Sequence, residues 1–212
     1  MKRQTIRSGA IRRDLSFLPL LLPRLALLLA LAVQSAPLQA QTLRIATYNT
    51  ELSRKGPGLL LRDIERGEDE QIQAVVAVIS QNQPDILVLQ GIDWDHDSRA
   101  LKALENRLAA AGSPFPHLFA RQPNTGLATE FDLDGDLRLG GPGDSQGYGD
   151  YTGRSGMAVL SRYPIVADEI SDLSGVLWRD MPGATLPHHP DGRPFPSSQA
   201  QAAQRLSSTA HW

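Results

Sequence analysis

Apolar and polar positions recur along the first half of the chain in patterns that predict strands and helices in turn. Residues 42–49 alternate and are rich in β-forming types, which predicts a strand that ends at Asn49. Residues 68–80 have acidic side chains first and then apolar ones at helical spacing, which predicts a helix. Residues 85–90 form a continuous apolar run, as in a strand buried on both faces. A strand, a helix and a strand in this order predict a parallel pair.

The α/β pattern continues beyond this pair and is interrupted by an irregular segment. A helix is predicted over residues 99–111, with Ser98 as its N-cap. Three leucines share one face of that helix: Leu101, Leu104 and Leu108. Short strands are predicted at four further places: residues 117–120, 157–161, 165–170 and 205–212. Residues 123–153 are rich in Gly, Asp and Asn without apolar periodicity, which predicts a long loop or insertion.

Composition and charge exclude several classes of protein. Hydrophobic types make up 41% of the 212 residues and charged types 21%, which excludes collagen-like, coiled-coil and wholly disordered chains. Six of the 21 basic residues but only one of the 23 acidic ones fall in the first forty positions, so the remainder is acidic and poorly suited to clamping nucleic-acid phosphates. The chain has no cysteine, so a metal must be held by oxygen or imidazole, which favours hard cations such as Mg²⁺ or Ca²⁺.

The first forty residues have the pattern of a cleaved export signal. Basic residues up to Arg13 precede an apolar core at residues 25–33, and small and polar residues follow. The core is shorter than the ~20 apolar residues that a membrane span needs, so no span is predicted. Cleavage after Ala40 would leave residues 41–212 as a single secreted or periplasmic domain. The alternative is a retained apolar helix at the N-terminus.

Polar side chains follow both strands of the predicted parallel pair. Asn49 ends the first strand, with Glu51 close behind, and Asp93 and Asp95 come soon after the second. Ligands gather outside the carboxyl ends of the strands in open α/β sheets, and Mg²⁺ takes one or two protein oxygen ligands. Asn49, Asp93 and Asp95 are therefore the candidate metal ligands. For Asn49 alone, the alternative is an ordinary turn residue at the end of a strand.

Three segments in order resemble the first signature segments of the endonuclease/exonuclease/phosphatase superfamily, the metal-dependent phosphoesterases related to DNase I. These segments are residues 43–51, 84–90 and 156–165. The resemblance implies an α/β fold, the DNase I-like four-layer α/β/β/α sandwich. It also implies hydrolysis of a phosphoester with Mg²⁺ or Mn²⁺, the substrate being a nucleic acid, a phospholipid or a small phosphorylated molecule.

The resemblance assigns roles to some residues and leaves others open. Asn49 matches the metal-site Asn of the family, but Gly91 stands where the family has its metal-binding Glu. The main carboxylate is therefore missing unless Asp93 or Asp95 reaches the ion. Arg154, just before the third signature segment, is a candidate phosphate contact, the alternative being a surface arginine.

The family also has an Asp-x-Asn segment and a C-terminal Asp-His pair, both of which should lie downstream of the strand predicted up to Trp212. By this resemblance the chain is the N-terminal part of the fold, and the catalytic residues are expected downstream of Trp212. His211 lies in a predicted strand and is not taken as a substitute base. Phosphoester hydrolysis requires a base and a complete metal site. Because the chain as given supplies neither, it is expected to be inactive.

The irregular segment holds a second candidate metal site. Asp132, Asp134 and Asp136 occupy the first, third and fifth places of a calcium loop. Leu137 and Gly143 stand where an EF-hand loop has Gly and Glu. Two interpretations remain open: a loop-held Ca²⁺ site and a solvated acidic insertion. The first leads to an alternative function for the chain, a non-catalytic secreted acidic module that binds calcium.

Overall fold

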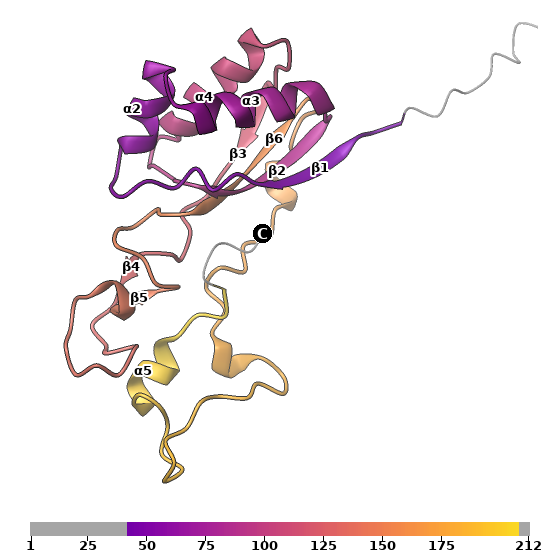
Figure 1. Ribbon diagram of the computed structural model, residues 1–212. Helices are drawn as coiled ribbons and strands as arrows, with labels where there is room; N and C mark the ends of the chain where they lie inside the picture. The colour runs from indigo at the N-terminus through magenta and orange to yellow at the C-terminus, as the bar shows by residue number, and fades with distance from the viewer. Residues whose placement is uncertain (1–41, 208–212) are drawn as a thin grey trace, which may run out of the picture. The chain divides into compact units, whose positions relative to one another are not determined.

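A mixed four-stranded sheet with helices on one face organises the described part of the chain (Figure 1). The computed structural model describes residues 42–207, and the elements named here fall within the unit Leu43–Trp212. The sheet has the order β1-β2-β6-β3, with β1 parallel to β2 and β6 antiparallel to both of its neighbours. Its strands are β1 (Ile45–Asn49), β2 (Ile86–Ile92), β3 (His117–Phe119) and β6 (Gly156–Ser161).

Three helices cover one face of this sheet (Figure 1): α2 (Leu59–Arg66), α3 (Glu70–Asn82) and α4 (Arg99–Ala110). The sheet residues below them are buried, as Leu87 and its cross-strand partner Leu160 show at 1% exposure or less. The next pair along the strands, Val88 and Val159, is only partly buried. This alternation follows from the period of two along a strand and places the hydrophobic core between the sheet and its helices.

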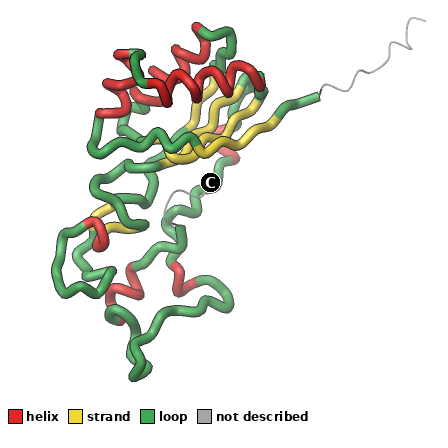
Figure 2. The backbone as a smooth tube through the Cα atoms, viewed as in Figure 1, coloured by secondary structure: helices red, strands yellow, loops and turns green. Residues whose placement is uncertain are grey.

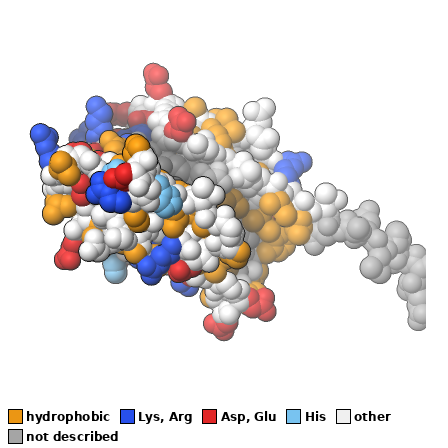
Figure 3. Space-filling view, turned by 90° about the horizontal axis from the view of Figure 1, so that it is seen from below, with side chains coloured by type: hydrophobic (Ala, Val, Ile, Leu, Met, Phe, Trp, Pro, Cys, Tyr) orange, Lys and Arg blue, Asp and Glu red, His pale blue; other side chains and the backbone are white. Residues whose placement is uncertain are grey.

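The surface outside this core is mixed in character. Figure 3 shows acidic and basic side chains interspersed on the face in view, with a patch of hydrophobic side chains among them. Ile45 on β1 is 67% exposed, although it lies in the sheet. None of the helices within residues 42–207 combines the length and the apolarity that crossing a membrane requires.

The structure confirms most of the predicted elements of the first half. The first strand ends at Asn49 and pairs in parallel with the second. The predicted helix at 68–80 is α3, which starts two residues later because Asp69 accepts a hydrogen bond from the Ile72 amide at 2.9 Å and so caps it. The three leucines predicted to share a face of α4 are all buried.

Two features of the helical layer differ from the sequence prediction. The side chain of Ser98 makes no capping hydrogen bond, and the Asp95 carboxylate caps α4 instead, by accepting from the amides of Arg99 and Ala100 at 2.7 and 2.9 Å. Helix α2, which Gly58 and Gly67 flank, is not predicted by the sequence pattern. Its buried residues Leu60 and Ile64 have the i,i+4 spacing of a helix.

Two of the predicted strands are wrong in the part that the structure describes. Residues 165–170 contain a 3₁₀ turn, Ala167–Glu169, because β6 already pairs on both sides and offers the following segment no open edge. Near the C-terminus Arg205 forms a single isolated bridge with Leu177. The rest of that predicted strand, residues 208–212 with His211 and Trp212, lies outside the described residues.

Loops predominate in the region after β6 and in the segment predicted as an insertion (Figure 2). Their short elements are β4 (Leu127–Ala128), β5 (Ser145–Gln146), the 3₁₀ turns Pro142–Asp144 and Trp178–Asp180, and α5 (Ser198–Ala203), which the sequence did not predict. Buried polar side chains hold these loops together. Asn124, 1% exposed, donates to the carbonyls of Ser174 and Ser207 at 2.8 and 2.7 Å. Such buried amides substitute for an apolar core in a loop-rich region.

Candidate active site

Asn49 and Gly91 meet where β1 and β2 end. Asn49 is paired with Gln90 and is exposed. β2 bulges between Gln90 and Ile92, and the buried Gly91 there has a φ of +68°, which favours glycine. A Cβ atom on Gly91 would lie 2.6 Å from Asn49 Oδ1 and 2.9 Å from the backbone nitrogen of Glu51. Position 91 therefore has no space for a side chain unless these neighbours move.

Asp93 joins two loops at this edge of the sheet. It is 9% exposed, and its Oδ2 accepts from the Arg54 amide at 2.8 Å while its Oδ1 accepts from the Ser155 amide at 3.0 Å. The Tyr151 hydroxyl donates to the Arg54 carbonyl at 3.0 Å. Burial raises the pKa of Tyr151, and the neighbouring Asp93 carboxylate adds to the rise. Both oxygens of Asp93 thus serve the backbone of the loops that frame the site.

Arg54 is the cation at the centre of the loop after β1. Its guanidinium contacts Asp63 and Asp69 at 3.0 and 2.9 Å, and its side chain is 14% exposed. Hydrogen bonds from Arg62 and then from Arg54 lower the pKa of Asp63 against the opposing effect of burial. Arg54 therefore ties the loop to α2 and to the start of α3. Nothing in the local sequence pattern singles out Arg54, because its partners Asp63 and Asp69 are 9 and 15 residues away.

A cleft of about 320 Å³ opens beside these residues. Its lining combines apolar side chains from α2 with polar groups from the strand ends and includes Leu60, Leu61, Asp93, Trp94, Arg99 and Tyr151. A volume of this size suits a small ligand or one group of a larger one. Asp95 also lines it, but both of its carboxylate oxygens accept α4 amides.

Arg154 lies between the loop and β6. Its Nη1 contacts the Asp150 carboxylate at 2.8 Å, and its side chain is 34% exposed. A partly exposed ion pair of this kind contributes little stability, so the guanidinium can exchange its partner for a phosphate at low cost. The phosphate contact remains a prediction.

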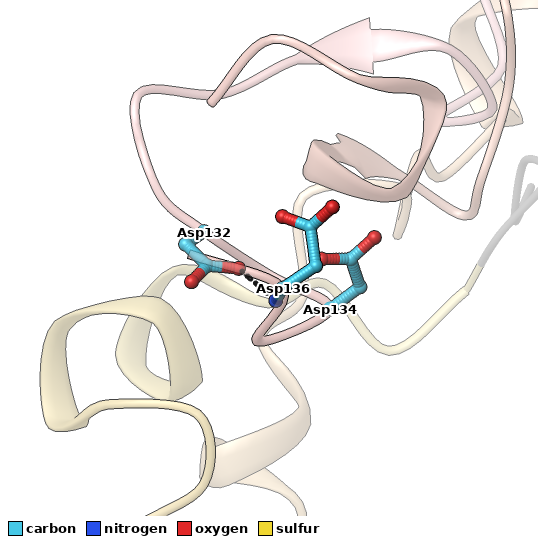
Figure 4. A group of neighbouring side chains, drawn as sticks. All are labelled: Asp132, Asp134 and Asp136. Atoms are coloured by element: carbon cyan, nitrogen blue, oxygen red, sulfur yellow. Dashed lines mark hydrogen bonds between the residues drawn. The ribbon is translucent and has the colours of Figure 1, made fainter. Parts of the chain in front are cut away.

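The three aspartates of the insertion lie close together in the structure (Figure 4). One ligand oxygen from each of Asp132, Asp134 and Asp136 lies within 4.8 Å of the others. Asp132 accepts hydrogen bonds from three backbone amides of its own loop, those of Gly135, Asp136 and Leu137. Leu137 has a φ of +66°, the conformation that favours glycine at this place of an EF-hand loop. The cluster could hold a metal ion, but exposed acidic groups often occur without one.

The fold and the site together define the class of protein. It is an α/β protein with oxygen ligands and a cleft at the carboxyl ends of its parallel strands. The family model of the endonuclease/exonuclease/phosphatase family matches residues 46–211. The chain therefore belongs to this family, with its DNase I-like fold. No curated protein and no solved structure matches the sequence.

The residues at the strand ends fit the family's divalent cation only in part. Asn49 Oδ1 accepts a single long hydrogen bond, from the Glu51 amide at 3.4 Å, and so keeps a free lone pair. Position 91 supplies no carboxylate. Asp93 and Asp95, the predicted replacements, have backbone partners on all four carboxylate oxygens, and their role as ligands remains a prediction.

Proposed function

We propose that this fold serves metal-dependent phosphoester hydrolysis in an exported protein. The observation that carries the proposal is the family match together with the amide oxygen of Asn49, which keeps a free lone pair at the end of β1. Phosphoester cleavage needs a cation that polarises a phosphoryl oxygen, and oxygen ligands favour Mg²⁺ or Mn²⁺. Export to the periplasm or the medium is proposed from the N-terminal signal pattern alone.

The substrate that the chain favours is small. The acidic balance of residues 41–212 and the interspersed charges of the surface in Figure 3 disfavour a long nucleic acid. A phospholipid headgroup or a small phosphorylated molecule suits the cleft better. Arg154 is proposed to contact its phosphate.

We expect residues 1–212 by themselves to bind a phosphoester without turning it over. Within residues 42–207 no histidine or carboxylate side chain is hydrogen-bonded to Asn49, so no base is held against Asn49 Oδ1. The loss of a positioned base alone typically lowers a rate by ~10²- to 10⁴-fold. The chain thus contributes to binding and positioning.

Binding of bis(p-nitrophenyl) phosphate by the full 212-residue chain tests this function. We expect saturable binding in the presence of Mg²⁺ or Mn²⁺, its loss with a chelator or in Asn49→Ala, and release of p-nitrophenol no faster than in buffer. Asn106→Ala is the matched control, since Asn106 is an exposed residue of α4. Absence of metal-dependent binding would overturn the proposed function, and hydrolysis that Asn49→Ala abolishes would overturn the expected inactivity.

The second candidate function, a calcium-binding acidic module, is favoured by the Asp132, Asp134 and Asp136 cluster. We expect Ca²⁺ at 100 times its Kd to stabilise the chain by about 2.7 kcal/mol, which raises the melting temperature by about 5 °C or more. A thermal melt of the full chain and of Asp134→Asn checks this, with Glu130→Gln as the exposed control. An equal shift in Asp134→Asn, or none in the unaltered chain, would rule the calcium module out.

A further inference from the structure

Gly91 and Glu51 are in close contact at the end of the parallel pair. A Cβ on Gly91 would approach the Glu51 nitrogen to 2.9 Å and the Glu51 Cα to 3.2 Å. Glu51 therefore lies directly against the bulge from which the family's carboxylate would project. The glycine that removes one carboxylate is also what allows the backbone of another acidic residue to come this close.

The backbone of Glu51 is fixed by neighbours on both sides. Thr50 donates from its amide and from its hydroxyl to the Gln90 carbonyl, at 2.9 and 3.0 Å. The Gln71 side-chain amide, on α3, donates to the carbonyls of Thr50 and Glu51 at 3.1 and 2.9 Å. Glu51 itself has a φ of +51°, which is uncommon outside glycine. Strain that surrounding bonds maintain in this way is typical of functional positions.

The side chain of Glu51 is exposed, and no hydrogen bond or ion pair joins it to any other residue in 42–207. It differs in this from Asp93 and Asp95, which follow β2. Both oxygens of Asp93 and both of Asp95 accept backbone amides. The Glu51 carboxylate is thus free of the contacts that engage Asp93 and Asp95 on both oxygens and Asp97 on one, where Oδ1 contacts the His96 ring at 3.3 Å.

We propose that Glu51 supplies the carboxylate ligand of the divalent cation in place of position 91, together with the amide oxygen of Asn49. The two residues lie two positions apart at the same strand end, and the Glu51 amide already donates to Asn49 Oδ1. One carboxylate and one amide oxygen match the one or two protein ligands with which Mg²⁺ or Mn²⁺ is held while it keeps several waters. The inference rests on the proposed function, because that function supplies the need for a cation here.

Binding of Mn²⁺ alone tests the assignment without any measurement of activity. The starting protein is the full chain carrying Asp134→Asn and Asp136→Asn, two exposed substitutions that silence the loop cluster. We expect this protein to bind one Mn²⁺ ion. Electron paramagnetic resonance measures the Mn²⁺ that stays free in solution and so gives the affinity. Glu51→Gln should weaken binding at least about tenfold, the size of effect that loss of outer-shell partners alone has on metal sites. Glu68→Gln, another exposed glutamate near the start of α3, should leave the affinity unchanged.

Three results would overturn the proposal: equal Mn²⁺ affinity in Glu51→Gln and Glu68→Gln, a loss in Asp93→Asn but not in Glu51→Gln, or no bound Mn²⁺ at all. Circular dichroism of each variant separates loss of a ligand from loss of folding. Metal-dependent phosphoester binding that is insensitive to Glu51→Gln would retain the proposed function and reject Glu51. Mn²⁺ binding that depends on Glu51, without any phosphoester binding, would retain Glu51 as a ligand and reject the proposed function.

Discussion

Replacing Asp93 by alanine is expected to lower the free energy of unfolding by about 3 to 6 kcal/mol, since two hydrogen bonds to a charged acceptor are lost at about 1.5 to 3 kcal/mol each. The two donors are the amides of Arg54 and Ser155, which lie 39 and 62 positions away in the sequence. Asp93 is 9% exposed, so solvent replaces the lost acceptor only in part. Urea unfolding of the full chain, followed by circular dichroism, measures the change.

Asp97→Ala is the matched control for Asp93→Ala. Its side chain is 75% exposed and contacts only the His96 ring, at 3.3 Å, so its removal is expected to cost less than about 0.5 kcal/mol. Asp93→Asn should lower the free energy of unfolding by an amount between those of Asp93→Ala and Asp97→Ala. The asparagine amide keeps one acceptor oxygen and turns an NH₂ group toward the other donor. Equal unfolding curves for Asp93→Ala and Asp97→Ala would show that Asp93 does not join the two loops.

The sequence was sufficient for the elements that depend on local patterns. The strand end at Asn49, the parallel pairing and the buried face of α4 all follow from apolar periodicity, and the structure agrees with each. The family resemblance, carried by three short segments, is confirmed by the match over residues 46–211. These segments are local too, so a single sequence is enough to find them.

Contacts between distant segments were beyond reach. The sequence placed Asp93 and Asp95 at the correct edge of the sheet but did not reveal that backbone amides occupy their oxygens. Asp95 replaces Ser98 as the cap of α4 because its carboxylate reaches two amides at once. The residues 165–170 have strand-like composition, but whether a strand forms there depends on a free sheet edge, which is a property of the whole topology.

The contacts within the polar loops could not be predicted from the sequence either. Asn124 and Gln146 hold segments 50 or more residues apart, yet neither belongs to a hydrophobic pattern. Buried amides of this kind have no sequence signature, because Asn and Gln are as common in exposed turns. The positive φ of Glu51 is likewise invisible before the bulge at Gly91 is known. The sequence shows Gly91 in place of the family's Glu, whereas the packing of Glu51 against Gly91 is a structural finding.

Restoring a side chain at position 91 is expected to damage the protein rather than repair its site. Gly91→Ala should cost about 2 to 5 kcal/mol, because a left-handed φ costs a non-glycine residue about 1 to 2 kcal/mol and overpacking adds about 1 to 3. The added Cβ would meet Asn49 Oδ1 at 2.6 Å and the Glu51 nitrogen at 2.9 Å. Gly91→Glu, which writes the family's carboxylate back into the sequence, should be at least as destabilising and should weaken Mn²⁺ binding by displacing Asn49 and Glu51.

Gly112→Ala separates backbone strain from steric contact in this prediction. Gly112 has a φ of +81°, close to the +68° of Gly91, but a Cβ there meets no atom within 4 Å. Gly112→Ala should therefore lower the free energy of unfolding by the backbone strain alone, about 1 to 2 kcal/mol. Urea unfolding of Gly91→Ala and Gly112→Ala gives the additional cost of the steric contact at position 91. If Gly91→Ala costs no more than Gly112→Ala, or if Gly91→Glu binds Mn²⁺ more tightly than the unaltered chain, the bulge has room for the family's carboxylate and Glu51 does not replace it.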